Sequence, residues 1–157
     1  IFNQRLALEK GLNSLYEIDE KYNDRIVISS PKGNLSCIPK LKNKFKHFYF
    51  KIPYDQYQTI LSQCGFVISF ANLEHFGTSI HEAITKGLCP LVIRNDTTCH
   101  KEVIIDELLF DDVNDLQNKI DDLTNNPNKK RELILKQQAF SSKYKKDNYI
   151  KNLLEQL

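Results

Sequence analysis

The sequence has 157 residues, of which 41% are hydrophobic and 27% charged, with a formal net charge of +2. This length and balance suit one globular domain with its own core, and so small a net charge gives no reason to expect a nucleic-acid-binding protein. No apolar run approaches membrane-spanning length, no secretory signal is visible, and the four cysteines lack the spacing of a zinc site. We therefore expect reduced cysteines, no transmembrane segment and a cytoplasmic protein.

Short apolar strands alternate with helices in the first part of the chain. Strands are predicted where β-branched or aromatic residues run together, and helices where apolar residues recur every three or four positions. Pro53 is expected at the start of a helix, because its missing N–H group has no partner there in any case. In order, the predicted elements are a strand ending at residues 1–3, a helix to about residue 22, strands at 25–30 and 47–52, and a helix at 54–64.

Residues 66–94 are the centre of the prediction, because they have the pattern of a strand, a loop, a helix and a second strand. The apolar run at 66–70 is typical of a strand buried on both faces. Thr78 is the expected N-cap of the helix and Gly87 its C-cap. The unit is a βαβ crossover, and ligands of such units bind beyond the carboxyl ends of the strands.

The last part of the chain is predicted to add one strand and three helices. The strand is expected at 107–110, and the helices at 113–124, 129–144 and 147–157. Strands and helices thus alternate along the whole chain, which predicts the α/β class with a mainly parallel sheet flanked by helices. No GxGxxG follows the first strand, and this absence counts against a dinucleotide-dependent dehydrogenase.

The polar residues of the central unit gather in the loop and the first turns of its helix. Glu74 precedes the helix and Glu82 lies inside it, where its side chain leans back toward the loop. Between them, Phe76, Gly77 and Thr78 bring backbone N–H groups to a helix N-terminus, a position that favours an anion. This layout predicts a pocket with carboxylates for hydroxyl groups and a positive backbone patch for phosphate, the groups that a nucleotide-sugar carries.

The run Glu74-His-Phe-Gly-Thr-Ser-Ile-His-Glu82-Ala, followed by Gly87, Pro90 and an aliphatic strand, resembles the donor-site motif of retaining GT-B glycosyltransferases. The resemblance implies a Rossmann-like domain over residues 1–157, the C-terminal, donor-binding half of a GT-B fold. It also implies a missing N-terminal domain that binds the acceptor, to which a C-terminal helix at residues 145–157 would cross. The chain would then be a piece of a longer hexosyltransferase and inactive by itself.

The same resemblance implies roles for individual residues. Glu74 would hold hydroxyl groups of the donor sugar, and Glu82 the ribose hydroxyls. Arg5 and Lys10 fit the two family positions whose cations reach the donor diphosphate. Two cations beside a helix N-terminus can offset the charge of a pyrophosphate and stabilise it as a leaving group.

The remaining donor contacts would come from the backbone. The N–H groups of Gly77 and Thr78, with Phe76 beside them, would complete the diphosphate site. Ile52 and Pro53 would contact the base at the turn between strand and helix. No metal or other cofactor is expected, because the cations and the helix end neutralise the leaving group.

Two alternatives remain open from the sequence. One is a different enzyme on the same fold, either a nucleotide-sugar epimerase or a tRNA-queuosine-type mannosyltransferase, and the latter is the one case with a nucleic-acid partner. The other is a non-catalytic nucleotide-binding or scaffold domain. The donor base, the sugar, the acceptor and the oligomeric state do not follow from the sequence.

Overall fold

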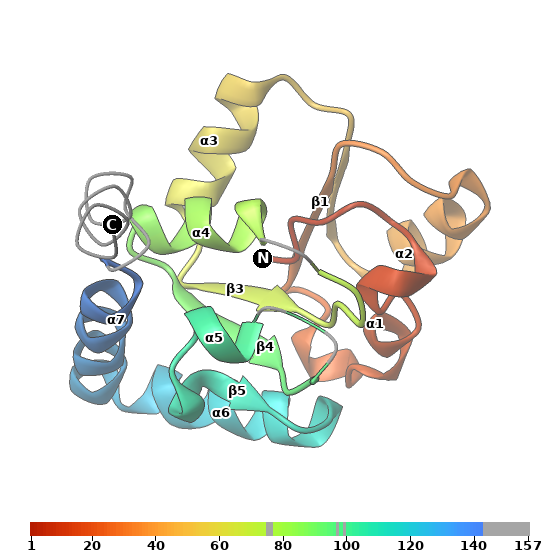
Figure 1. Ribbon diagram of the computed structural model, residues 1–157. Coiled ribbons are helices and arrows are strands. Elements are labelled where there is room, and N and C mark those ends of the chain that lie inside the picture. Colours follow the sequence, from red (N-terminus) through yellow and green to blue (C-terminus); the bar gives the residue numbers. More distant parts are fainter. Residues whose placement is uncertain (75–76, 97, 99, 143–157) are drawn as a thin grey trace.

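The computed structural model describes residues 1–74, 77–96, 98 and 100–142. All paired strands run parallel and helices flank them, so the predicted α/β class is confirmed (Figure 1). One group has the order β1-β2 and the other β3-β4-β5. The strands are β1 (Val27–Ser30), β2 (His47–Phe50), β3 (Phe66–Ser69), β4 (Cys89–Ile93) and β5 (Leu109–Phe110).

The first residues of the chain join these two groups of strands. The Phe2 N–H donates to the Val27 carbonyl at 2.9 Å, and the Ser29 N–H donates to the Phe2 carbonyl at 2.9 Å. On the other side, the Ile68 N–H donates to the Ile1 carbonyl at 2.8 Å. Residues 1–2 therefore lie between β1 and β3 (Figure 1), and the strand predicted at residues 1–3 is present as a short bridging segment.

Most predicted helices are present to within a few residues. The α-helices are α1 (Ser14–Glu17), α2 (Ile38–Lys44), α3 (Tyr54–Ser62), α4 (Thr78–Thr85), α5 (His100–Val103), α6 (Val113–Asn125) and α7 (Pro127–Ser141). Short 3-10 helices occur at Leu8–Lys10, Glu20–Tyr22, Leu35–Cys37 and Asp106–Leu108. The last of these replaces the first half of the strand predicted at 107–110. The helix predicted at residues 145–157 lies outside the described residues.

The single helix predicted to residue 22 is wrong. Helix α1 ends after one turn because Ile18 takes an extended conformation, with φ −62° and ψ 133°. This turn buries the Ile18 side chain in the core and lets the Asp19 N–H donate to Gln117 Oε1 at 2.7 Å. Tertiary contacts with α6 thus override the local helical pattern.

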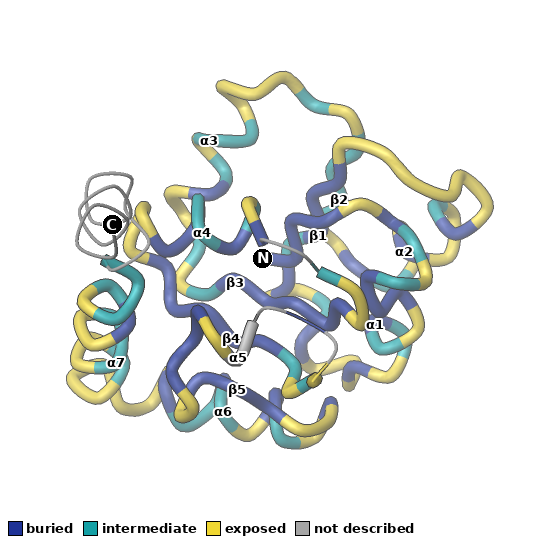
Figure 2. The backbone as a smooth tube through the Cα atoms, in the orientation of Figure 1, coloured by how far each residue is buried: buried dark blue, intermediate teal, exposed yellow. Residues whose placement is uncertain are grey.

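Helix α4 covers the centre of the sheet, where it contacts β3 and β4 (Figure 2). Its predicted inner residues, Ile80, Ala83 and Ile84, are all buried. The cap prediction is wrong by one residue: Gly77 is the N-cap, with φ +70°, and Thr78 is the first helical residue. The C-cap likewise falls on Lys86, and Gly87 follows it in the left-handed conformation, with φ +85°.

Helices α6 and α7 complete the domain, with α6 on β5 and α7 against both α4 and α6 (Figure 1). The Gln137 side chain of α7 is buried and hydrogen-bonds the backbone of Val103 and Ile105, which fixes the segment before β5. Within the described part of the chain, every helix is too short or too polar to cross a membrane.

Candidate functional site

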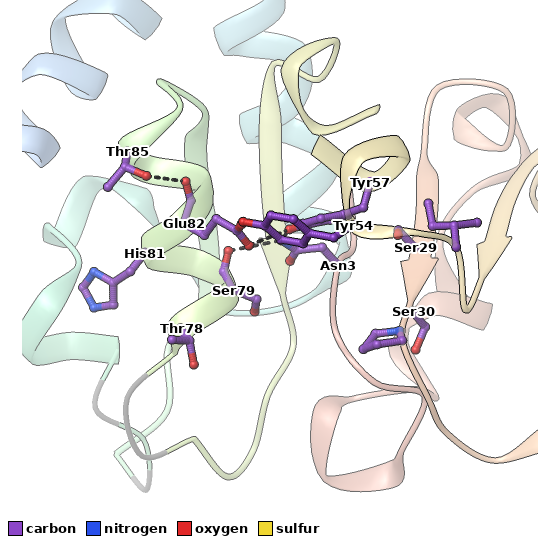
Figure 3. Close-up of a pocket in the computed structure, with 12 residues that line it drawn as sticks. Asn3, Ser29, Ser30, Tyr54, Tyr57, Thr78, Ser79, His81, Glu82 and Thr85 are labelled. Carbon is purple, nitrogen blue, oxygen red and sulfur yellow. Dashed lines mark hydrogen bonds between the residues drawn. The ribbon is translucent and has the colours of Figure 1, made fainter. Parts of the chain in front are cut away.

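A pocket of about 820 Å³ opens between α3, α4 and the carboxyl end of β1 (Figure 3). This is where ligands of parallel α/β sheets bind, beyond the carboxyl ends of the strands. The lining combines hydroxyl, amide and carboxylate groups with a few apolar side chains. The lining residues are Asn3, Ser29, Ser30, Pro31, Ile52, Tyr54, Tyr57, Thr78, Ser79, His81, Glu82 and Thr85.

The Glu82 carboxylate lies in the wall of this pocket and is held by three side chains of α3. Its Oε1 accepts hydrogen bonds from the Tyr54 hydroxyl at 2.7 Å and from Gln58 Nε2 at 2.6 Å. Its Oε2 accepts from the Tyr57 hydroxyl at 3.1 Å. The carboxylate therefore has a fixed position one turn into α4, and it lines the pocket (Figure 3).

Tyr57 and Asn3 link α3 to the N-terminal segment. Asn3 is buried, and its amide donates to the Tyr57 hydroxyl at 2.9 Å and to the Ser79 carbonyl at 3.1 Å. Burial, and in addition the negative charge of Glu82, raises the pKa of Tyr57 to about 12. Tyr57 therefore stays protonated at physiological pH and remains a hydrogen-bond donor to Glu82.

Glu74 and Lys10 form an ion pair beside the N-terminus of α4. Lys10 Nζ lies 2.6 Å from Glu74 Oε2 and 2.8 Å from the Leu73 carbonyl oxygen. The Gly77 N–H donates to Glu74 Oε1 at 3.1 Å. The two charged side chains are only 11% and 17% exposed. Glu74 thus contributes to the cap of α4, while the buried Lys10 places a positive charge at the same point.

Arg5 does not join this group. Its side chain is 46% exposed, and the guanidinium lies 2.7 Å from Oε1 of Glu9, four residues later in the sequence. The structure therefore brings Lys10, Glu74 and Gly77 together, while Arg5 is paired with a different carboxylate.

The other predicted residues divide into three groups. Thr78 and Ile52 line the same pocket as Glu82. Pro53 is the residue before the first turn of α3, outside the pocket lining described above. Phe76 lies outside the described residues.

The pocket and the Lys10–Glu74 pair are joined by the first turn of α4. The N–H groups in the first turn of an α-helix have no intrahelical partners, and here they include those of Thr78 and Ser79, which line the pocket. The helix dipole adds a partial positive charge at this end. A carboxylate, a helix N-terminus and a cation therefore lie at or next to the first turns of α4, and together they suit a ligand with hydroxyl groups and an anionic centre.

Sequence reasoning missed several residues of this surface. Asn3, Ser29 and Ser30 come from strand ends, and Tyr54 and Gln58 from the first turns of α3. Each precedes Glu82 in the chain by at least 24 residues, as the 24-residue separation of Gln58 and Glu82 illustrates. The one available signal was the position of Asn3, Ser29 and Ser30 at the carboxyl ends of predicted strands, where side chains of parallel sheets converge.

The sequence profile of the family described as glycosyl transferases group 1 matches residues 38–140. The chain belongs to this family. The matched range includes Glu74 and Glu82 and stops short of Arg5 and Lys10, so family membership rests on the part of the chain that forms α2 to α7. A comparison with curated proteins finds no match.

Solved structures show that this group 1 domain has the fold of a GT-B C-terminal half, as the resemblance predicted. It is similar to the catalytic domain of cholesterol-α-glucosyltransferase from Helicobacter pylori, with a TM-score of 0.68 and 22% identity over 90% of this chain and 97% of that one. It is also similar to the C-terminal domain of a group 1 glycosyl transferase (LpcC) from Francisella tularensis, with a TM-score of 0.72 and 15% identity over 92% and 87% of the two chains.

A third similar structure is HepE of Anabaena in complex with UDP, with a TM-score of 0.66 and 18% identity over 99% of this chain. This chain covers 48% of HepE, so the described domain corresponds to about half of that protein. At these levels of identity the three likenesses establish the fold, and the ligand belongs to HepE.

Proposed function

We propose that this domain binds the nucleotide-diphosphate sugar of a retaining glycosyltransferase, and that an N-terminal domain supplies the acceptor. One observation carries the proposal: Glu82 and Thr78 line the pocket, and Gly77, the residue before Thr78, is hydrogen-bonded to the Lys10–Glu74 pair, so these three features come in this order. A ribose, a diphosphate and a sugar follow one another in the same way along the donor.

The ribose and base occupy the pocket in this proposal. Glu82 faces the pocket with a carboxylate whose position is fixed by α3, which suits it to accept hydrogen bonds from ribose hydroxyls. Ile52 and Pro31 supply apolar surface for the base. A volume of about 820 Å³ is within the range of pockets that hold ligands of this size.

The diphosphate lies at the first turn of α4, within reach of Lys10. A lysine ammonium has three donors, and Lys10 uses two of them on the Leu73 carbonyl and Glu74. Its third N–H remains for a phosphate oxygen, so the ion pair with Glu74 need not break when the donor binds. Arg5 would have to leave Glu9 to reach the same phosphates.

Chemistry follows from these positions. When the bond between the anomeric carbon and the phosphate oxygen breaks, the electron pair goes to the diphosphate. Lys10, Arg5 and the N–H groups of α4 stabilise the negative charge that develops there. Glu74 orients the donor sugar by accepting hydrogen bonds from the hydroxyl groups of that sugar. The Glu74–Glu82 motif supports retention of configuration at the anomeric carbon. NMR tests this by showing whether the sugar product has the same anomeric configuration as the donor.

The tRNA alternative is the weaker one on this surface. It calls for free basic groups near the pocket, and residues 40–46 are rich in lysine. All four of those lysines have local partners. Lys40 Nζ lies 4.0 Å from the centre of the Tyr16 ring, Lys42 lies over Phe48, Lys44 donates to the Ile18 carbonyl, and Lys46 pairs with an aspartate. These contacts favour a structural role for the lysine-rich segment.

Lys10→Met should weaken nucleoside diphosphate binding by about tenfold and nucleoside monophosphate binding by less than about twofold. The reason is that we place Lys10 at the second phosphate of the diphosphate, which a nucleoside monophosphate lacks. Calorimetric titration with both ligands, well below the unfolding temperature, measures this difference. Lys86→Met is the matched control, because Lys86 is exposed at the opposite end of the same helix. Equal losses for the two ligands would contradict the assignment of Lys10.

A further inference from the structure

The hydrogen bonds that Glu82 already accepts leave too few acceptor sites for a ribose. A carboxylate offers about four acceptor sites, two on each oxygen. Tyr54 and Gln58 fill both sites of Oε1, and Tyr57 takes one of the two on Oε2. A single acceptor site is then left, whereas the 2′- and 3′-hydroxyl groups of a ribose present two donors. One of the three side chains of α3 must therefore leave before both hydroxyl groups can bind.

Tyr57 and Gln58 are held in place by their surroundings. The Tyr57 ring packs against the hydrophobic core, and its hydroxyl also accepts a hydrogen bond from the buried Asn3 amide. Gln58 is half-buried and makes the shortest of the three bonds to Glu82, at 2.6 Å. Moving either side chain would disturb contacts inside the domain.

Tyr54 is held least. It is the first residue of α3 and is 69% exposed. Its ring has one aromatic neighbour among the described residues, Tyr57, and the two ring centroids are 6.0 Å apart. Rotation of its side chain would cost one hydrogen bond in a solvent-accessible position. Figure 3 shows Tyr54 lying across the pocket with its hydroxyl group at Glu82.

We propose that Tyr54 is a specificity-determining residue that occupies the ribose-binding site on Glu82 in the free protein and is displaced by ribose hydroxyl groups. This inference rests on the proposed function. A ligand with free ribose hydroxyl groups gives Glu82 a donor in place of Tyr54, whereas a ligand without them gives it none. Tyr54 therefore lowers the affinity for ribonucleotides by the cost of its displacement, and it leaves ligands without those hydroxyl groups unaffected.

Tyr54→Phe tests the proposal, because it keeps the ring and removes only the competing hydroxyl group. UDP, GDP and ADP are titrated against wild type and variant, each beside its 2′,3′-dideoxy counterpart. The expected result is a gain of about three- to tenfold in affinity for the ribonucleotide that binds, the size expected for one hydrogen bond to a charged group at an exposed site. The dideoxy counterpart should change by less than about twofold.

Tyr49→Phe serves as the control, since this tyrosine lies on β2 outside the pocket lining. Ribonucleotide affinity that is unchanged or lower in Tyr54→Phe would overturn this inference alone. A gain shared equally by the dideoxy ligand would overturn it as well. Failure of wild type and variant to bind any of the three nucleoside diphosphates would overturn the proposed function, and this inference with it.

Discussion

Glu82→Ala should lower the affinity for a nucleoside diphosphate by about 30- to 100-fold while the domain stays folded. The loss corresponds to about 2–3 kcal/mol, the size expected when two hydroxyl groups lose a charged acceptor. Stability should fall by about 1 kcal/mol, because Glu82 is half-buried at the wall of an open pocket, where water can replace its carboxylate as the acceptor for the three α3 side chains. Calorimetric titration and urea unfolding measure the two effects separately.

Glu132→Ala provides the comparison for this variant, since Glu132 is an exposed glutamate on α7. Its affinity should match the wild type within about twofold. If Glu82→Ala bound nucleotides as well as Glu132→Ala does, the carboxylate would have only a structural role between α3 and α4.

Gly11→Ala should destabilise the domain by about 3 kcal/mol or more, the largest effect expected on stability. Gly11 has φ +71°, a conformation that costs an L-residue about 1–2 kcal/mol. A Cβ atom there would also lie 2.2 Å from Phe70 Cβ and 2.4 Å from the Phe70 carbonyl oxygen. Because Phe70 is buried directly after the end of β3, the two backbone segments would have to move apart, which adds about 1–3 kcal/mol. Urea unfolding measures the difference.

Gly87→Ala separates the two causes. Gly87 also has a positive φ, +85°, but nothing lies within 4 Å of the Cβ position. This variant should lose only about 1–2 kcal/mol. Equal losses at both positions would mean that the close approach of Gly11 to β3 contributes nothing to stability.

The central βαβ unit was predictable because its signals are local. A β-branched run, helical spacing at Ile80, Ala83 and Ile84, and a glycine after the helix all lie within a short segment and agree with one another. The exact caps were less predictable. Thr78 has the better N-cap side chain, yet Gly77 takes that position because the backbone turns through a left-handed conformation there and the Glu74 carboxylate bonds its N–H group.

The site itself was predictable only in part. Glu74 and Glu82 were predicted as site residues because a single motif holds both, and the family resemblance added Arg5 and Lys10 from the start of the chain. Tyr54 and Asn3 reach the pocket through the order of strands in the sheet, which places α3 and the N-terminal segment beside α4. The extended conformation of Ile18, which ends α1, has the same kind of origin, because the next residue, Asp19, donates a backbone hydrogen bond to Gln117 on α6. Long-range contacts of this kind leave no periodic pattern in the sequence.

The most direct test of nucleotide-sugar binding is the unfolding temperature of this chain with UDP, GDP or ADP present. A ligand that binds only the folded state raises the midpoint as its concentration passes the dissociation constant. We expect one base to raise it by roughly 5–10 °C at a hundredfold excess over that constant, and so to name the donor class. An unchanged midpoint with all three nucleotides at millimolar concentration would contradict the proposal that the pocket at Glu82 is a donor site.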